Sequence, residues 1–367
     1  MITISLCMIV KNEEAVLERL LRTMSTVADQ IVIMDTGSTD RTKEIAARYT
    51  DEVYDFPWTD DFAAARNAAC QKAVSDYWMW MDADDVMEPE QAARLKKLKE
   101  TLDPSVDVVM MKYLTGFDEN GRTSFSYYRE RILKNHKGFR WQGRVHEAVP
   151  PAGNILYTDI EIQHRKEGAG DKDRNLRIYE TMLSQGKPLE PRHQFYYARE
   201  LYYHERYEDA VRVFRAFLQE PDGWVENKID ACLHLALCQE HLGHTEKAVE
   251  ALLKSFLYDS PRGEACCELG RMKMKEEKYR EAAYWYTQAL SSRPAEQTGA
   301  FVRKDCYGFL PAIQLCVCFF MMREPPRAWH YHLKSQKLKP EHPSVRQNQT
   351  YFEHILKRPA EGQPSAQ

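Results

Sequence analysis

Hydrophobic and polar positions alternate along the first 83 residues with two different periods. Short β-rich runs ("TISLCMIV", "QIVIMD", "DEVYDF", "DYWMWMDA") are separated by amphipathic segments ("EEAVLERLLRTM", "TDRTKEIAARY", "DDFAAARNAACQKA"). Strands that alternate with helical segments are typical of a parallel, doubly wound sheet. We therefore expect an α/β domain in the first part of the chain.

The pattern becomes helical and repetitive after about residue 192. The stretch "ACCELGRMKMKEEKYREAAYWYTQALSSRP" has Gly270, Ala282, Ala289 and Pro294 at the spacing of a tetratricopeptide helix pair. Weaker copies place Ala210, Ala248 and Ala328 where Ala282 stands, and Ala198, Ala236 and Cys316 where Gly270 stands. About four helix pairs are expected, enough to stack into a continuous core.

Polar residues follow three of the predicted strands at the point where each strand ends. Residues 11–13 (Lys-Asn-Glu) follow the first, 35–38 (Asp-Thr-Gly-Ser) the second and 82–85 (Asp-Ala-Asp-Asp) the fourth. In open α/β sheets, ligands bind beyond the carboxyl ends of the strands. The three segments are therefore expected to line one crevice.

The carboxylates of the third segment suit a divalent cation. Asp82 and Asp84 are alternate residues, so their side chains would share a face in an extended segment. Mg²⁺ or Mn²⁺ prefers such oxygen ligands and often completes its shell with substrate phosphates. The alternative is that Asp84 and Asp85 only end a strand and that one of them caps a helix beginning near Pro89.

Composition and charge argue against a nucleic-acid-binding protein and against a membrane-spanning protein. The 367 residues are 43% hydrophobic and 29% charged, with a net charge of −4, so no overall positive field favours nucleic-acid binding. The longest uncharged apolar stretch, 307–322, is shorter than the roughly 20 residues of a membrane span, and the first residues do not read as a signal peptide. Nine scattered cysteines suggest buried thiols in a reducing compartment. We expect a soluble, cytoplasmic protein.

Four segments in this order, "LCMIVKNEE", "VIMDTGSTDRT", "FAAARNAA" and "MWMDADDVM", resemble the nucleotide-sugar half of the family 2 glycosyltransferases, which have the GT-A fold. The resemblance covers roughly residues 1 to 165. It implies that 82–84 is the DXD motif, with Asp84 as metal ligand and Asp82 nearer the ribose. It also implies a Mg²⁺ or Mn²⁺ cofactor and a nucleotide-sugar donor, with UDP favoured by its frequency in the family.

The same resemblance assigns the nucleotide pocket. Its implied residues are Asp35, the backbone of Ile9, Val10 and Lys11, and the side chains of Glu13 and Arg66. Asp35 could accept a hydrogen bond from a base imide, or it could only satisfy its own turn.

The segment "GFRWQGRVHEAV" is the candidate for the acceptor side of the reaction. Glu147 is predicted to be the general base and His146 a third metal ligand or a diphosphate contact. Adjacent residues of a strand face opposite sides, so only one of the two would enter the site, and a structural role for Glu147 stays open.

Two further candidates follow this segment. His164 is a second candidate metal ligand, although a lone histidine is more often structural. Lys172 and Arg174, on the polar stretch "RKEGAGDKDRN" with Gly168 and Gly170, could close over the diphosphate and exclude water, or could belong to a solvated mobile loop.

The domain order resembles the sublancin-type peptide S-glycosyltransferases. The change of sequence pattern, with the GT-A fold implied above, predicts a GT-A catalytic domain over 1–190 and a tetratricopeptide-like helical domain over 191–357, and composition predicts a disordered tail over 358–367. The resemblance implies an inverting transfer to a Cys or Ser/Thr side chain of a peptide or protein acceptor, and dimerisation through the helices. The alternatives are transfer to an envelope polysaccharide or lipid-linked glycan, with peripheral membrane contact, and a non-catalytic repeat adaptor.

Overall fold

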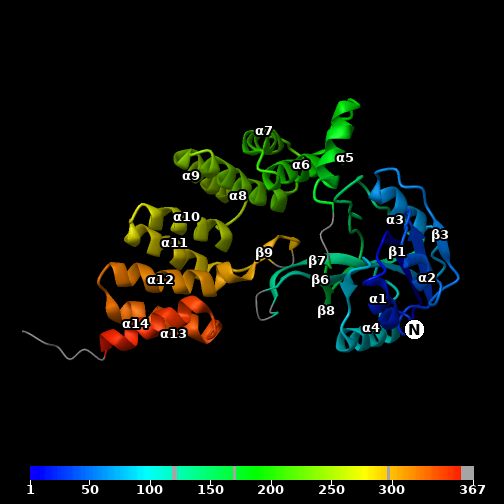
Figure 1. The fold of residues 1–367 in the computed structure, drawn as a ribbon, viewed down its shortest axis with the longest axis horizontal. Helices are drawn as coiled ribbons and strands as arrows, with labels where there is room; N and C mark the ends of the chain where they lie inside the picture. Colours follow the sequence, from blue (N-terminus) through cyan, green and yellow to red (C-terminus); the bar gives the residue numbers. More distant parts are fainter. Residues whose placement is uncertain (118–120, 122, 168–170, 296–297, 357–367) are drawn as a thin grey trace, which may run out of the picture. The chain divides into compact units, whose positions relative to one another are not determined.

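The computed structural model describes residues 1–117, 121, 123–167, 171–295 and 298–356 (Figure 1). The chain divides into two compact units, a first built mainly from Met1–Val213 and a second built mainly from Trp224–Ala295 and the residues from Val302 on. The predicted tail over 358–367 and the glycines at 168 and 170 lie outside the described residues.

The first unit contains a sheet with the strand order β3-β2-β1-β4-β7-β6-β8-β5. Its strands are β1 (Ile4–Val10), β2 (Gln30–Asp35), β3 (Val53–Asp55), β4 (Tyr77–Trp80), β5 (Asp85–Val86), β6 (Val108–Phe117), β7 (Thr123–Lys134) and β8 (Ile155–His164). The first four strands pair in parallel, as the sequence pattern predicts. Antiparallel pairs join β7 to β4 and β6, and β5 to β8, so the sheet as a whole is mixed.

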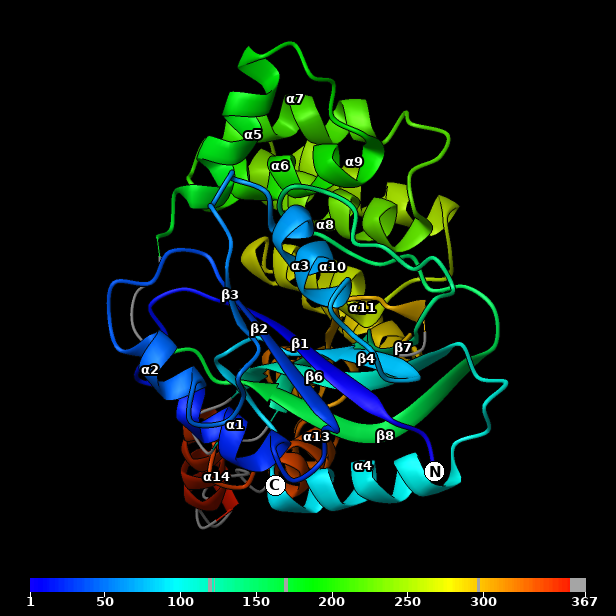
Figure 2. The ribbon, with the colours of Figure 1, turned by 90° about the vertical axis from the view of Figure 1, so that its right-hand side faces the viewer.

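Helices cover both faces of this sheet (Figure 2). They are α1 (Leu17–Met24), α2 (Thr42–Ala46), α3 (Phe62–Cys70) and α4 (Pro89–Thr101). Because side chains alternate along a strand, Leu6 and Met8 of β1 belong to the core that includes α1 and α4, whereas Cys7 belongs to the core that includes α3. Packing in the two cores fixes the positions of the strands. The polar segments at 11–13, 35–38 and 82–85 begin where these strands end.

Most of the described residues after β8 lie in helices. The helices are α5 (Arg174–Ser184), α6 (Pro191–Tyr203), α7 (Tyr207–Phe217), α8 (Val225–His241), α9 (Thr245–Lys254), α10 (Gly263–Lys275), α11 (Tyr279–Ser291), α12 (Phe309–Met321), α13 (Pro325–Leu338) and α14 (Pro343–Leu356), with a short strand β9 (Val302–Arg303). Four pairs, from α6/α7 to α12/α13, carry the repeat positions predicted from the sequence. All the small residues at those positions are buried, and a Cβ on Gly270 would lie 2.8 Å from the Tyr286 ring. The predicted fold class, an α/β domain followed by tetratricopeptide-like helices, is confirmed.

The first helix of each pair ends in the same way. A residue with positive φ follows it: Glu205 (59°), Gly243 (79°), Glu277 (58°) and Arg323 (61°). In each case the next amide donates to a carbonyl five residues back, as in a Schellman motif. The turns therefore keep one geometry although only one of them has glycine at this position.

Two simpler expectations can be compared with the structure. None of the described helices combines the length and the apolar character needed to cross a bilayer. All nine cysteines are free thiols, and all except the half-buried Cys70 are buried, as the scattered spacing predicts.

Candidate active site

The ends of β1 and β2 lie side by side and are tied together by hydrogen bonds. Val10 is paired in register with Asp35. Beyond the strands, the amide of Asn12 donates to Ser38 Oγ at 2.9 Å and the amide of Glu13 donates to Thr42 Oγ1 at 2.7 Å. The sheet thus brings together two of the three segments that were expected to share a crevice.

Asp35 is buried and only half satisfied. Its Oδ1 accepts hydrogen bonds from the amides of Gly37 and Ser38 at 2.9 and 2.8 Å. Its Oδ2 is buried without a partner among the described residues. A buried carboxylate oxygen without a donor is unfavourable, so a bound N–H group would stabilise this site.

Residues 82–85 form a tight turn after β4. The amide of Asp82 donates to Asp85 Oδ2 and the amide of Asp85 donates to the carbonyl of Asp82, both at 3.0 Å. The extended conformation assumed from the sequence is therefore wrong, and Asp82 and Asp84 have different partners. Capping of α4 by Asp84 or Asp85 is also excluded, because its N-cap is Glu88 and no side chain caps it.

Arg66 of α3 joins two of the predicted carboxylates. Its Nη2 donates to Asp82 Oδ1 and its Nε to Glu147 Oε1, both at 2.6 Å. The guanidinium lies beside the rings of Trp80 and Trp141, at 5.1 and 4.8 Å from their centroids. Its Nη1 is buried without a partner in the described structure.

The same ion pairs shift the pKa values of this group. Burial alone would raise the pKa of Asp82, but the charges of Arg66 and Arg131 hold it well below its usual range. Burial would lower the pKa of Arg66, whereas Asp82 and Glu147 raise it further. Asp82 and Arg66 are therefore both charged at neutral pH, with one guanidinium nitrogen left for an anionic oxygen.

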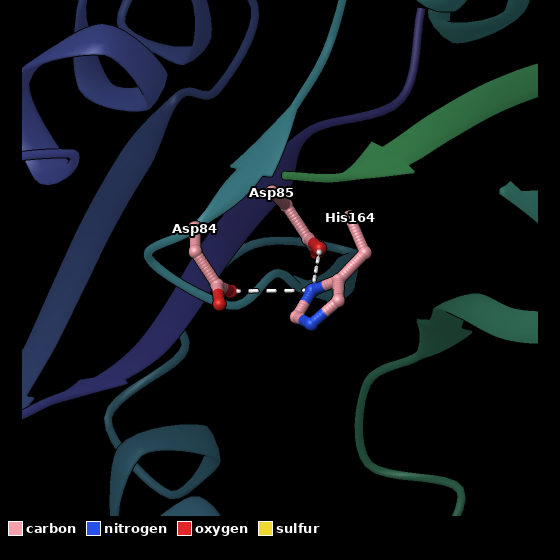
Figure 3. Close-up of side chains that lie close together, drawn as sticks. All are labelled: Asp84, Asp85 and His164. Carbon is pink, nitrogen blue, oxygen red and sulfur yellow. Dashed lines mark ion pairs between the residues drawn. The ribbon is translucent and has the colours of Figure 1, made fainter. Parts of the chain in front are cut away.

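Asp84, Asp85 and His164 form a possible metal-binding group (Figure 3). His164 Nδ1 lies 3.3 Å from Asp84 Oδ1 and 3.5 Å from Asp85 Oδ1, and the candidate ligand atoms lie within 4.8 Å of one another. Two carboxylates and one imidazole are a donor set that suits Mn²⁺ and tolerates Mg²⁺. The residues present fit a divalent cation.

Two residues in and near this group, His164 and Glu13, have shifted pKa values. Burial would lower the pKa of His164, but its hydrogen bonds to Asp84 and Asp85 raise it to about 10. Burial, together with the charges of Asp84 and Asp82, raises the pKa of Glu13 to about 7. The ends of β1 and β4 thus bring Glu13, Asp82 and Asp84 close to one another, and the end of β8 adds His164. A bound cation would stabilise this group of acidic side chains.

The other predicted residues are not part of the metal-binding group. His146 Nε2 bonds to Glu200 Oε1 of α6 at 2.8 Å, and His146 is not part of the metal-binding group. Arg174 begins α5 and lies over the ring of Phe62 at 4.6 Å, while Lys172 is exposed. Ile9 is half-buried at the end of β1, Val10 is buried and Lys11 is exposed.

Sequence reasoning missed the support of the metal-binding group. Asp85 is fully buried, and it accepts hydrogen bonds from Tyr113 of β6 at 2.7 Å and from Arg131 of β7 at 3.1 Å. Tyr113 also bonds His164 Nδ1 at 2.9 Å. A signal was present in "YYRERILK", where Arg131 precedes apolar residues of a strand, but its partner could not be read from the sequence.

Comparison with known proteins agrees with this geometry. Residues 5–156 match the family model for glycosyl transferase family 2. A TPR repeat-containing protein of Synechococcus elongatus is 33% identical over 41% of this chain and 36% of its own length. The glycosyltransferase SunS of Bacillus subtilis is 26% identical over 57% of this chain and 51% of its own. The lipopolysaccharide core biosynthesis glycosyltransferase LpsC of Rhizobium meliloti is 27% identical over 39% of this chain and 56% of its own.

The chain spans less than two thirds of the length of each of these relatives. Among solved structures, glucosyl-3-phosphoglycerate synthase from Mycobacterium tuberculosis has 22% identity and a TM-score of 0.27 over 30% of this chain and 43% of its own. MamA has 18% identity and a TM-score of 0.35 over 44% and 85%. These scores are too low to support an inference about the site. The match of residues 5–156 to the family model for glycosyl transferase family 2 agrees with the chemistry at the strand ends.

Proposed function

We propose that this protein is an inverting, metal-dependent glycosyltransferase that moves a sugar, from UDP-hexose, to a Cys, Ser or Thr side chain of a peptide or protein. The observation that carries the proposal is the pairing of two groups around one turn. Asp84 and His164 offer metal ligands on one side of it. On the other side, Asp82 accepts a hydrogen bond from Arg66, which also donates to Glu147.

Donor binding would use the groups that lack partners in the protein. The orphan oxygen of Asp35 suits the imide N–H of a uracil, and the unpaired Nη1 of Arg66 suits a phosphate or sugar oxygen. Asp84 and His164, with Asp85 behind them, would hold a divalent cation, which would neutralise charge on the leaving diphosphate.

Transfer forms a bond from the acceptor sulfur or oxygen to the anomeric carbon as the bond from that carbon to the diphosphate breaks. We assign Glu147 the acceptor proton, because it is a nearly buried carboxylate, 11% exposed, beside the donor residues. Arg66 fixes the direction of this carboxylate through a 2.6 Å hydrogen bond. The tetratricopeptide-like helices would present the acceptor, by analogy with other helical repeats that bind extended peptides.

A second acceptor class is favoured by one observation. One of the relatives is the lipopolysaccharide core biosynthesis enzyme LpsC, so an envelope glycan is the alternative acceptor. Dimerisation through the helices remains a prediction from the resemblance.

The first experiment is a panel of UDP-, GDP-, dTDP- and CMP-sugars with and without Mn²⁺, read by thermal stability and by release of free nucleotide. A bound ligand raises stability by mass action, so stabilisation by one donor only with metal, together with slow hydrolysis, supports the transferase. No stabilisation and no release with any donor would contradict it and favour the repeat adaptor. The active donor would then be tested with Cys- and Ser-containing peptides, Ala-substituted controls and lipid-linked glycans.

A further inference from the structure

The segment that carries Glu147 forms a closed loop. Gln142 and Ala148 exchange backbone hydrogen bonds of 2.9 and 3.1 Å, which close residues 143–147 into a tip. His146 within this tip has a φ of 51°, which is uncommon for a residue with a side chain. A residue in this conformation persists where its surroundings fix it, so the neighbours of the loop decide its shape.

One side of the loop is attached to α3, the helix of Arg66. The amide of Phe62 donates to the carbonyl of Arg144 at 2.8 Å. The Asn67 side chain exchanges two hydrogen bonds with the backbone of Trp141, at 2.9 and 3.0 Å. Together with the bond from Arg66 to Glu147, these contacts fix the base of the loop and one side of its tip.

The other side of the loop is attached to α6. His193, Tyr196 and Glu200 are spaced by three and four residues, so they lie on one face of this helix. A Cβ on Gly143 would lie 2.2 Å from His193 Nε2, which shows how closely the loop approaches that face. The contact involves a helix that the sequence pattern assigns to the repeats.

His146 is held by three separate contacts from α6. Its ring stacks on Tyr196 with 4.2 Å between centroids and 9° between planes. Its Nε2 bonds to Glu200 Oε1 at 2.8 Å, and its carbonyl accepts from Arg192 Nε at 3.2 Å. Glu200 is itself fixed by a 3.0 Å hydrogen bond from Asn175 of α5.

The positive φ at His146 separates two neighbouring side chains. In a strand His146 and Glu147 would simply face opposite sides. Here the turn sends His146 to α6 and Glu147 to Arg66. Whatever fixes His146 therefore also fixes the direction in which Glu147 leaves the backbone.

We propose that Glu200 is a positioning residue for the transfer reaction: by holding His146 in this turn, it aims the Glu147 carboxylate. This inference rests on the proposed function, because Glu147 has a catalytic role only if transfer occurs. It assigns to α6, a helix of the repeat pattern, a direct part in the geometry of the active site.

Steady-state kinetics test the proposal with Glu200→Ala, Glu200→Gln and a control, Glu208→Ala, at an exposed residue in the first turn of α7. In Glu200→Ala, kcat is expected to fall on the order of 10- to 100-fold, because small misplacements of reacting groups have effects of this size. The donor KM is expected to change by less than about threefold, since the groups that contact the donor are unaltered. Glu200→Gln keeps the shape and a hydrogen-bonding atom and should retain most of the turnover.

An unchanged kcat in Glu200→Ala, or a change in KM alone, would overturn the proposal. If Glu200→Ala does not fold, Tyr196→Leu decides: a lower kcat at constant KM supports positioning, and an unchanged kcat refutes it.

A second measurement does not depend on activity. Hydrogen exchange of the amides in 142–148 should be faster in Glu200→Ala than in the wild type or Glu208→Ala, while exchange in β1 and β2 stays the same. Equal exchange in all three proteins would overturn the positioning role even if transfer is observed. Absence of turnover in the wild type with every donor would instead count against the proposed function, and the exchange result would still decide whether Glu200 holds the loop.

Discussion

Arg131 donates a hydrogen bond of 3.1 Å to the carboxylate of Asp85, and both side chains are fully buried. The Asp85 carboxylate also accepts hydrogen bonds from the hydroxyl of Tyr113 and from the backbone amide of Asp82. Asp85 is therefore the centre of the turn that follows β4. A carboxylate with this many partners is held in one orientation. Its neighbours Asp84 and His164 therefore start from a fixed geometry.

Removing Arg131 should destabilise the fold strongly. Arg131→Met removes the buried guanidinium that pairs with Asp85, and loss of one partner of a buried pair lowers the free energy of unfolding by about 3–5 kcal/mol. Urea denaturation would measure the change. Lys43→Ala is the control, because the Lys43–Asp55 pair is exposed and exposed pairs contribute little. Equal stability of wild type and Arg131→Met would contradict the role given to the pair.

Asp84→Asn should abolish the response to metal and leave the fold intact. Asp84 lies at a turn outside the hydrophobic cores, and its substitution removes a negative ligand oxygen. Thermal stability with and without Mn²⁺ and donor is the measurement, with far-ultraviolet circular dichroism as the check on folding. A variant that is still stabilised by Mn²⁺, or that still hydrolyses the donor at the wild-type rate, would rule out Asp84 as a ligand.

The stability of the metal-free protein should depend on pH through His164. The folded pKa is raised to about 10 from an ordinary value of 6.5. Stabilisation by the protonated ring is therefore complete below about pH 6.5 and is lost as pH rises toward 10. In chelator, the difference in free energy of unfolding between wild type and His164→Gln should shrink between about pH 6 and about pH 9.5. A difference that stays constant over this range would show that the ring does not titrate as described.

Glu147→Gln should separate donor binding from transfer. The amide oxygen can still accept from Arg66, so the loop and the donor site are expected to persist. The amide cannot take the acceptor proton, so kcat should fall by roughly 10²–10⁴-fold. Donor-induced stabilisation and acceptor glycosylation are measured on the same preparation. Transfer at the wild-type rate would show that another group is the base.

Gly143→Ala should destabilise the protein, and the size of the effect should depend on whether His193 is present. Gly143 has a φ of 95°, and an added Cβ would meet His193 Nε2 at 2.2 Å. Backbone strain and the clash together should lower the free energy of unfolding by roughly 1–3 kcal/mol. The double variant with His193→Ala should lose less than the sum of the single variants, because the clash is gone while the strain remains. Strict additivity would mean that the loop does not approach α6 this closely.

Much of the α/β fold could be predicted from the local sequence pattern. The four parallel strands follow from their alternating β-rich runs, and the carboxylates at their ends follow from the general position of ligand sites in such sheets. His164 was found as a candidate because it follows a strand-like run, although its partners were unknown. The repeat positions could also be predicted, because small residues at fixed spacing are a requirement of close helix packing.

The features of the site that could not be predicted from the sequence depend on pairing between segments that are distant in the chain. The antiparallel strands β6 and β7 bring Tyr113 and Arg131 to Asp85, and no local pattern encodes that register. The turn over 82–85 replaced an extended segment because backbone amides bond to Asp85 and Asp82. The sequence predicts His146 as a metal ligand or a diphosphate contact because it stands next to Glu147. Its actual contacts are with Tyr196 and Glu200, which lie about 50 residues away in the chain.

The left-handed turns after α6, α8, α10 and α12 show where the repeats could be strengthened by protein engineering. Glu205, Glu277 and Arg323 occupy a conformation in which an L side chain is penalised by about 1 kcal/mol, and Gly243 shows that the same turn accepts glycine. A variant with glycine at all three sites would keep every backbone hydrogen bond of the turns. Such a variant would be a more stable form of the protein in which to study mutations that destabilise the α/β domain.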